Sequence, residues 1–297
     1  MLTQSPSTVK AYSVGDIYDE PGCIATDDVD GVITCDHNGT VNTAVIGEYT
    51  VSYFAEDSSG NVGYLDVTYV VMRDATLLDT DLSTYYDSAE GLYGTDLLLA
   101  LRTIINTGIF RTSYDEDRYI LDETDRDPNN SSNVILVYLG TSVSGVWDAG
   151  VTWNREHVWP QSLLGEDVSG SDRNSASDLH NLKPADPGTN SSRSNKYYDN
   201  TTTTVSYAPR AAVKGDLARI LFYMEVMYDY LELINGVPAT YQMAMLDTLI
   251  DWHENDAVDT FEQNRNDVIY SYQFNRNPFI DYPHLFELIY FDHEYYA

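Results

Sequence analysis

A chain of 297 residues with 43% hydrophobic residues and 25 Tyr can form two packed domains, which excludes a disordered protein. No apolar run approaches the roughly 20 residues of a membrane-spanning helix, and the first residues lack the basic and then apolar pattern of a signal peptide. The formal charge of −31 fits either an acidic protein that binds cations or a protein adapted to salty water, and the scarcity of Lys favours the second.

Residues 1 to about 73 alternate polar and apolar side chains, which is typical of short β-strands. The clearest apolar positions are Tyr49, Val51, Tyr53, Leu65, Val67, Tyr69 and Val71. Turn sequences such as Asp30-Gly31, Asn38-Gly39 and Ser59-Gly60-Asn61 separate the runs. We expect an all-β sandwich over residues 1–75.

Cys23 and Cys35 are the two cysteines of the chain. Two cysteines alone are compatible with free buried thiols. Their position in neighbouring strand-like segments favours a disulfide in an exported domain.

From about residue 92 the apolar residues follow the helical period, which indicates a second domain over residues 76–297. We expect helices at 97–105, Gly215–Ile234, Tyr241–His253 and Thr260–Tyr272. A strand is predicted at Val134–Leu139, and a loop at Asp122–Asn133, where Pro, Asn, Ser and charged residues are concentrated. This mixture predicts an α+β domain.

Positive charge is scarce in this chain and concentrated in one segment. Eight of the 16 Lys and Arg lie between Arg155 and Arg219, next to a His, a Glu and several Asn. The first five of these cations are Arg155, Arg173, Lys183, Arg193 and Lys196. Because Arg and amide side chains donate to phosphate oxygens, we expect a phosphate to bind in this segment.

Glu156 and His157 are adjacent within this segment, and Trp153, Val158 and Trp159 flank them. If the triplet Arg155-Glu156-His157 stood alone, an exposed polar patch on a strand would be the better interpretation. Here the apolar flanks favour a site in which desolvation adjusts the pKa of the charged groups, and a neutral His can accept a proton from water. Neighbouring residues of a regular strand point to opposite faces, so the pair serves one site only if the strand bends or if the pair brackets the phosphate.

A short helix is predicted to begin after Asp186, with Asp186 as its N-cap and Pro187 as its first residue. Asn190 and Arg193 then share one face of the helix. Zinc is not favoured, because no HExxH motif occurs and neither cysteine lies near. A carboxylate, an amide oxygen and water suit Mg²⁺, with the substrate phosphate completing its shell.

Several ordered motifs resemble the bacterial endonuclease I family. These are TWNREHVWPQS, SDLHNLKPAD and GTNSSRSN, followed by GDLARILFYM, LIDWHENDAVDTFEQNRNDVIY and NRNPFIDYPHLFELI, so that the resemblance covers about residues 78–292. Most of residues 9–72 similarly resembles bacterial immunoglobulin-like modules. The family resemblance implies a secreted or periplasmic ββα-metal nuclease with a mainly helical second half.

The resemblance also implies roles for individual residues. His157 would be the general base, Glu156 and Asn190 would bind one divalent ion, and Asn181 would brace the site. Mg²⁺ is the expected ion, with Mn²⁺ and Ca²⁺ as alternatives. We expect Arg155, Arg193, Asn195 and Arg276 to bind substrate. The substrates would be double- and single-stranded DNA, and RNA as well, cut to 5′-phosphate products.

The chain departs from some family members in two respects. The nuclease domain has no cysteines, whereas those members carry several disulfides there. The link between the two central motifs is short, whereas those members have a long insertion whose Arg steadies the transition state. Arg173 is the only Arg in this link and the first candidate for that role, and Arg193 is the second.

Together these features predict an extracellular or cell-surface, salt-adapted, sequence-non-specific endonuclease that acts as a monomer. The alternative is a surface-binding protein in which the sandwich is the functional part and the nuclease-like domain is inactive. The presence of His157, Glu156 and Asn190 together argues against an inactive domain.

Overall fold

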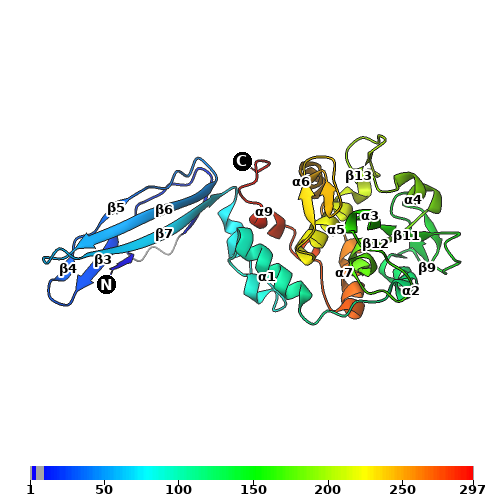
Figure 1. Ribbon diagram of the computed structural model, residues 1–297, viewed down its shortest axis with the longest axis horizontal. Helices are drawn as coiled ribbons and strands as arrows, with labels where there is room; N and C mark the ends of the chain where they lie inside the picture. Colours follow the sequence, from blue (N-terminus) through cyan, green and yellow to red (C-terminus); the bar gives the residue numbers. More distant parts are fainter. Residues whose placement is uncertain (1, 5–9, 297) are drawn as a thin grey trace. The chain divides into compact units, whose positions relative to one another are not determined.

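The computed structural model describes residues 2–4 and 10–296 (Figure 1). Its contacts separate two compact units, one with residues 1–95 and 287–297 and one with residues 96–286. The proposed boundary at 75/76, between two parts that each fold alone, remains a prediction. Within the described part of the chain, no helix combines the length and apolar character needed to cross a membrane.

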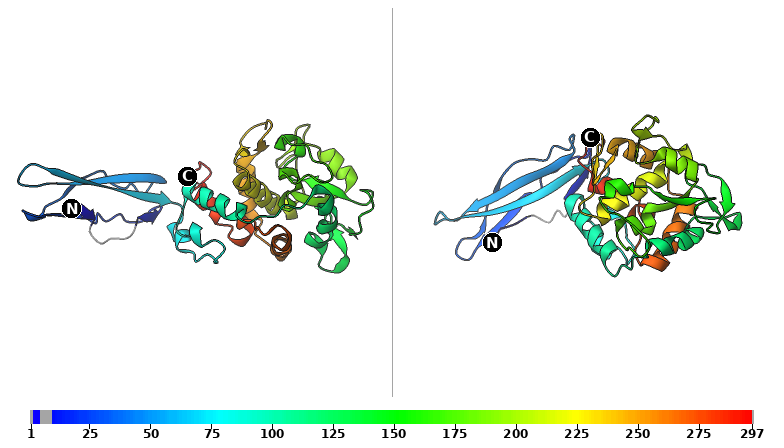
Figure 2. Two further views of the ribbon diagram at one scale, coloured as in Figure 1. Left: turned by 60° about the horizontal axis from the view of Figure 1, so that its bottom comes forward. Right: turned by 45° about the vertical axis from the view of Figure 1, so that its right-hand side comes forward.

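The first unit contains two β-sheets. One has the order β1 (Leu2–Gln4), β3 (Cys23–Asp27), β4 (Gly31–Ile33). The other has the order β2 (Ala11–Ser13), β7 (Val62–Met72), β6 (Gly47–Glu56), β5 (Asp36–Asn38), and the long β6–β7 hairpin runs along the two-sheet part of the unit (Figures 1 and 2). The predicted all-β N-terminal region is therefore confirmed.

Alternation along β6 and β7 builds the core of this unit. Val51 and Tyr53 on β6 and Val67, Tyr69 and Val71 on β7 are all buried, as the two-residue period predicts. A disulfide joins Cys23 on β3 to Cys35, just before β5, so the free-thiol alternative is not what the structure shows.

The second unit surrounds a buried helix with further helices and short strand pairs. The central helix is α5 (Lys214–Met227), most of whose residues are buried. The longer helices around it are α1 (Gly94–Asn106), α2 (Tyr114–Thr124), α6 (Leu246–Asn255) and α7 (Thr260–Gln273). The helices predicted at 97–105 and at Thr260–Tyr272 are confirmed.

Two predicted helices are too long. The helix expected to reach Ile234 ends at Met227, and residues Glu232–Ile234 form strand β15. Strand β16 (Gln242–Ala244) pairs with β15, so the helix expected from Tyr241 begins only at Leu246. Leu231 and Leu233 are buried, like most residues of α5 before them. Because the apolar run continues from the helix into a buried strand, the sequence pattern does not reveal where the helix ends.

The loop predicted at Asp122–Asn133 is also wrong. Helix α2 continues to Thr124, and β8 (Arg126–Asp127) then pairs antiparallel with β9 (Asn130–Ile135). The strand predicted at Val134–Leu139 therefore begins and ends earlier than expected. The first residues of β9 are exposed on this hairpin, where Asn and Ser are tolerated.

A buried ion cluster stabilises the strand β12 (Leu182–Ala185). Lys183 Nζ lies 2.7 Å from Asp125 Oδ1, and Arg265 Nε lies 3.2 Å from Asp125 Oδ2. Arg265 also donates to the carbonyls of Leu179 and Leu182 at 2.6 Å each. Burial alone would raise the pKa of Asp125, but Lys183 and Arg265 outweigh it and lower that pKa. Lys183 is thus a structural cation and not part of the predicted phosphate site.

Candidate active site

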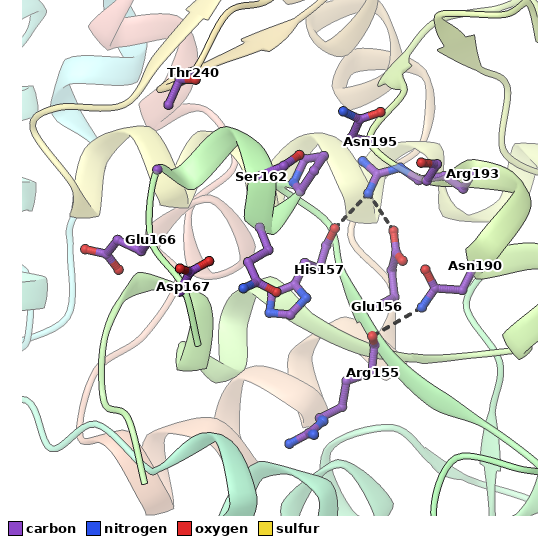
Figure 3. Close-up of a pocket in the computed structure, with 14 residues that line it drawn as sticks. Arg155, Glu156, His157, Ser162, Glu166, Asp167, Asn190, Arg193, Asn195 and Thr240 are labelled. Atoms are coloured by element: carbon purple, nitrogen blue, oxygen red, sulfur yellow. Dashed lines mark hydrogen bonds and ion pairs between the residues drawn. The ribbon is translucent and has the colours of Figure 1, made fainter. Parts of the chain in front are cut away.

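The predicted motifs meet on two strands and one helix. Strand β11 (Asn154–His157) pairs antiparallel with β12, with Glu156 opposite Lys183 and His157 opposite Leu182. Helix α4 (Pro187–Arg193) follows β12, and its N-cap Asp186 accepts from the Thr189 backbone N–H at 2.7 Å, as predicted. These elements border a pocket of about 720 Å³ (Figure 3).

Glu156 is 1% exposed yet borders this pocket. Its Oε1 accepts from Arg193 Nη1 at 2.7 Å and from the Tyr138 hydroxyl. Burial raises the pKa of Glu156, and Arg193 counteracts the rise only in part. The carboxylate is therefore held rigidly, and its charge is not fully compensated.

Arg193 holds the end of β11 as well. It donates to the carbonyls of His157 at 2.8 Å and Val158 at 2.7 Å, and its guanidinium lies 4.6 Å from the Tyr198 ring centroid. Arg193 lines the pocket, but these contacts occupy both terminal nitrogens (Figure 3). Its observed contacts therefore position Glu156 rather than leave the group free for substrate.

The contacts of His157 determine which ring nitrogen can act as a base. Its Nε2 lies 2.9 Å from the Ala176 carbonyl oxygen. A carbonyl can only accept, so Nε2 carries the proton and Nδ1 keeps its lone pair. Burial lowers the pKa of His157 to about 4, which keeps the ring neutral near pH 7. The ring of Tyr114 stacks on it, with centroids 5.6 Å apart.

Asn190 presents its amide oxygen to Glu156. Its Nδ2 donates to Asn154 Oδ1 at 2.7 Å and to the Arg155 carbonyl at 3.2 Å, and these bonds turn Oδ1 toward the Glu156 carboxylate (Figure 3). One carboxylate and one amide oxygen form a hard-oxygen pair, which fits Mg²⁺ or a similar ion with water and phosphate as further ligands.

The structure brings together six of the nine predicted site residues. The pocket lining includes Arg155, Glu156, His157, Asn190, Arg193 and Asn195. Glu156 and His157 both line it, although they are consecutive residues of β11. Arg155 stacks on the Tyr114 ring at 3.4 Å and donates to the Tyr114 carbonyl.

Three predicted residues lie outside this lining. Asn181 is buried and bonds the Trp159 backbone, so it braces the residues after His157 without holding the ring. Arg173 donates to the Arg111 carbonyl and to Glu116 at 3.0 Å. Arg276 pairs with Asp267 at 2.8 Å and Asp281 at 2.6 Å. Carboxylates thus bind Nε and Nη2 of Arg276, and its role in substrate binding remains a prediction.

Other pocket residues were not among the predicted site residues. Glu166, Asp167 and Thr240 border the side of the pocket beyond His157 (Figure 3), and Gln161 and Ser162, the last two residues of the first motif, also line it. In the short link after the first motif, the sequence predicts Arg173 as a site residue. Glu166 and Asp167 come from that same link, but in so acidic a chain two further carboxylates do not stand out.

Comparisons with known proteins agree with this geometry. The family model described as Endonuclease I matches residues 93–284, and that of the bacterial surface protein Ig-like domain matches residues 5–68. An "Extracellular ribonuclease" of Bacillus subtilis (strain 168) is 41% identical over 70% of this chain and 78% of its own length. Another protein of that name, from Bacillus amyloliquefaciens, is 41% identical over 68% of this chain and 76% of its own length.

Likeness to solved structures adds nothing to this. A lipoprotein from Bacteroides thetaiotaomicron aligns with 24% of this chain and 37% of its own, at 23% identity and a TM-score of 0.22, which carries no argument. The family match instead covers most of the chain and includes every residue of the pocket. The chain therefore belongs to the Endonuclease I family and is a nucleic-acid phosphodiester hydrolase with a bacterial immunoglobulin-like domain ahead of its nuclease region.

Proposed function

We propose that this nuclease is secreted, depends on a divalent ion, and cuts both DNA and RNA without sequence preference. The observation that carries the proposal is the placement of three groups in one pocket. His157, whose Nδ1 keeps its lone pair, lines the same pocket as Glu156 with its carboxylate and Asn190 with its amide oxygen. This combination supplies a base and a cation site to the same phosphate.

The proposed reaction is attack of water on the phosphorus. Nδ1 of His157 takes a proton from the water as the new P–O bond forms, and the bond to the 3′ oxygen breaks. Glu156 and Asn190 would hold Mg²⁺, which when bound supplies positive charge to the phosphate and the leaving oxygen. The 3′ oxygen takes a proton from solvent, so the products are a 5′-phosphate and a 3′-hydroxyl. Arg155 and Asn195 donate hydrogen bonds to the phosphate from the pocket wall.

A water nucleophile makes both nucleic acids substrates, because it needs no 2′-hydroxyl. The relatives are named ribonucleases, which supports RNA as a substrate, and the family name supports internal cleavage. Their names also describe extracellular enzymes. The Cys23–Cys35 disulfide supports the same compartment, since disulfides persist in oxidising surroundings.

The direct test is cleavage of a supercoiled plasmid and of a transcribed RNA, with and without EDTA. We expect both to be cut with Mg²⁺ and neither with EDTA. End mapping should find 5′-phosphates on both products. Undiminished cleavage in EDTA would contradict the dependence on metal, and 2′,3′-cyclic phosphates on RNA would contradict attack by water. Binding of the plasmid without cleavage would instead favour the surface-binding alternative.

A further inference from the structure

Two exposed tyrosines stand at the edge of the catalytic pocket. Tyr230 and Tyr241 are 40% and 46% exposed, and their ring centroids lie 5.6 Å apart at an interplanar angle of 82°. Neither ring is needed by the reaction as proposed. The two rings meet edge to face, and both residues keep a large exposed fraction.

Pocket residues hold both rings in place. The Tyr230 hydroxyl lies 3.4 Å from Glu166 Oε1, and Glu166 in turn accepts from the backbone N–H and the hydroxyl of Ser175 at 3.1 and 2.8 Å. The Tyr241 ring packs on Gly165, where an added Cβ would lie 2.3 Å from the ring carbon Cε1. Glu166 and Gly165 both line the pocket, so each ring contacts a lining residue, although neither tyrosine lines the pocket itself.

Tyr241 has a backbone conformation that bulky residues rarely adopt. Its φ is 72°, in the left-handed region. The Tyr241 N–H donates to the Leu163 carbonyl at 2.6 Å, and its own carbonyl accepts from Glu232 at 3.0 Å. An exposed aromatic residue kept in an unfavourable conformation beside a catalytic pocket suggests a use for the ring.

The charges nearby indicate which part of a nucleic acid would reach these rings. Figure 3 places Glu166, Asp167 and Thr240 on one side of His157, and Asn190, Arg193 and Asn195 on the other. A phosphate is repelled by the two carboxylates, whereas an uncharged base is not. Every base has a π-face that can stack on an aromatic ring, so such binding tolerates any sequence.

We propose that Tyr230 and Tyr241 form a stacking subsite for an unpaired base next to the phosphodiester that is cut. The inference rests on the proposed function, because it places the reacting phosphate at His157. Stacking compensates for the electrostatics of a chain with a net charge of −31, which cannot rely on a broad basic surface to hold a polyanion. The subsite therefore favours single-stranded segments over intact duplex.

The first test is the kinetics of Tyr230→Leu and Tyr241→Leu on a single-stranded oligonucleotide. Each change should raise KM about 5- to 100-fold, the range for losing one stacked base, with kcat nearly unchanged. Tyr230→Phe and Tyr241→Phe keep an aromatic ring and should therefore have the wild-type KM. The matched control is Phe274→Leu, because Phe274 is 53% exposed and also left-handed (φ 61°), but it is the C-cap of α7.

The second test keeps the protein intact and changes the substrate. Removing the base of one nucleotide beside the cleaved bond should raise the wild-type KM by the same factor as Tyr241→Leu. Combining the abasic substrate with the variant should add little further, because the two changes remove one contact. The stacking subsite would be overturned if the factors in KM from the abasic substrate and the variant multiplied in full, or if no abasic substrate raised the wild-type KM.

Binding without turnover separates this inference from the proposed function. Wild type and the Leu variants are titrated with a fluorescent oligothymidylate in EDTA, with melting curves to verify folding. Weaker binding by folded Leu variants supports the subsite even if no cleavage is found, in which case the proposed function alone fails. Equal binding and equal KM in folded variants would overturn the subsite while leaving a functional nuclease intact.

Discussion

Two buried carboxylates, Asp125 and Glu156, show how similar charges serve different purposes. Asp125 binds two cations, Lys183 on one oxygen and Arg265 on the other. Glu156 lies opposite Lys183 in the strand pair, but among the residues that the structure describes it pairs with one cation, Arg193, through Oε1. The pKa of Asp125 is lowered and that of Glu156 is raised.

The difference indicates which carboxylate can accept a further cation. The charge of Asp125 is fully compensated by neighbours within the fold, so its cluster stabilises the structure. The charge of Glu156 is under-compensated, and the residue borders a pocket together with the amide oxygen of Asn190. A buried ion pair thus becomes a candidate metal site where a negative charge remains and faces a pocket.

The largest expected effect belongs to the pocket side of this comparison. His157→Ala should lower kcat by about two to four decades, the range for losing a general base. Melting temperature and Mg²⁺ affinity should stay near wild type, because the proposed ligands are Glu156 and Asn190. Single-turnover cleavage with calorimetry on the same sample checks both, and near wild-type turnover would refute the assignment of the base.

The next effect belongs to the structural side. Asp125→Asn leaves Lys183 and Arg265 buried without a carboxylate, so unfolding should become easier by about 3–5 kcal/mol. Urea denaturation measures the change. The matched control is Asp267→Asn at the exposed pair with Arg276, which should cost under about 1 kcal/mol and leave cleavage unchanged. Equal losses in the two variants would mean that burial does not distinguish them.

The sequence predicted the residue types of both regions but not their partners. Asp186 and Pro187 place the start of α4 by local rules, and α4 brings Asn190 and Arg193 toward β11. Lys183 appeared to be part of the phosphate site because Asp125 is distant in the sequence. Arg173 and Arg276 were chosen by position, and only tertiary contacts show that Glu116 and Asp281 bind them.

A change in pH should reveal the neutral state of His157. Its pKa falls from 6.5 to about 4, so it remains an unprotonated base until the pH nears 4. We expect kcat/KM to stay constant as the pH is lowered and to fall only near pH 4. Circular dichroism at each pH verifies that the protein is still folded. Because the pKa is lower in the folded protein, His157 also makes the free energy of unfolding depend on pH. Its contribution is complete above pH 6.5 and is lost as the pH falls toward 4. An acid limb near pH 6.5 would show that the ring is not desolvated in solution.

The smallest expected effect concerns salt. A charge of −31 repels nucleic acid at long range, and this repulsion is screened as the Debye length falls from about 10 Å at 0.1 M to about 3 Å at 1 M. Contact attraction also weakens with salt, but Lys183, Arg193 and Arg219 are buried in ion pairs and contribute little to it. The initial rate should therefore rise with NaCl, peak at several tenths molar and then decline. A steady fall from about 50 mM upward would contradict salt adaptation.

Calorimetric titration of Mg²⁺ into wild type, Glu156→Gln and Asp125→Asn decides whether Glu156 is a metal ligand. We expect wild type to bind one ion and Glu156→Gln to bind it far more weakly, with excess Mn²⁺ partly restoring the cleavage by Glu156→Gln. Folded Asp125→Asn should bind Mg²⁺ as wild type does, because the charge of Asp125 is already compensated. Unchanged affinity in Glu156→Gln would contradict the assignment of the pocket carboxylate as the metal ligand.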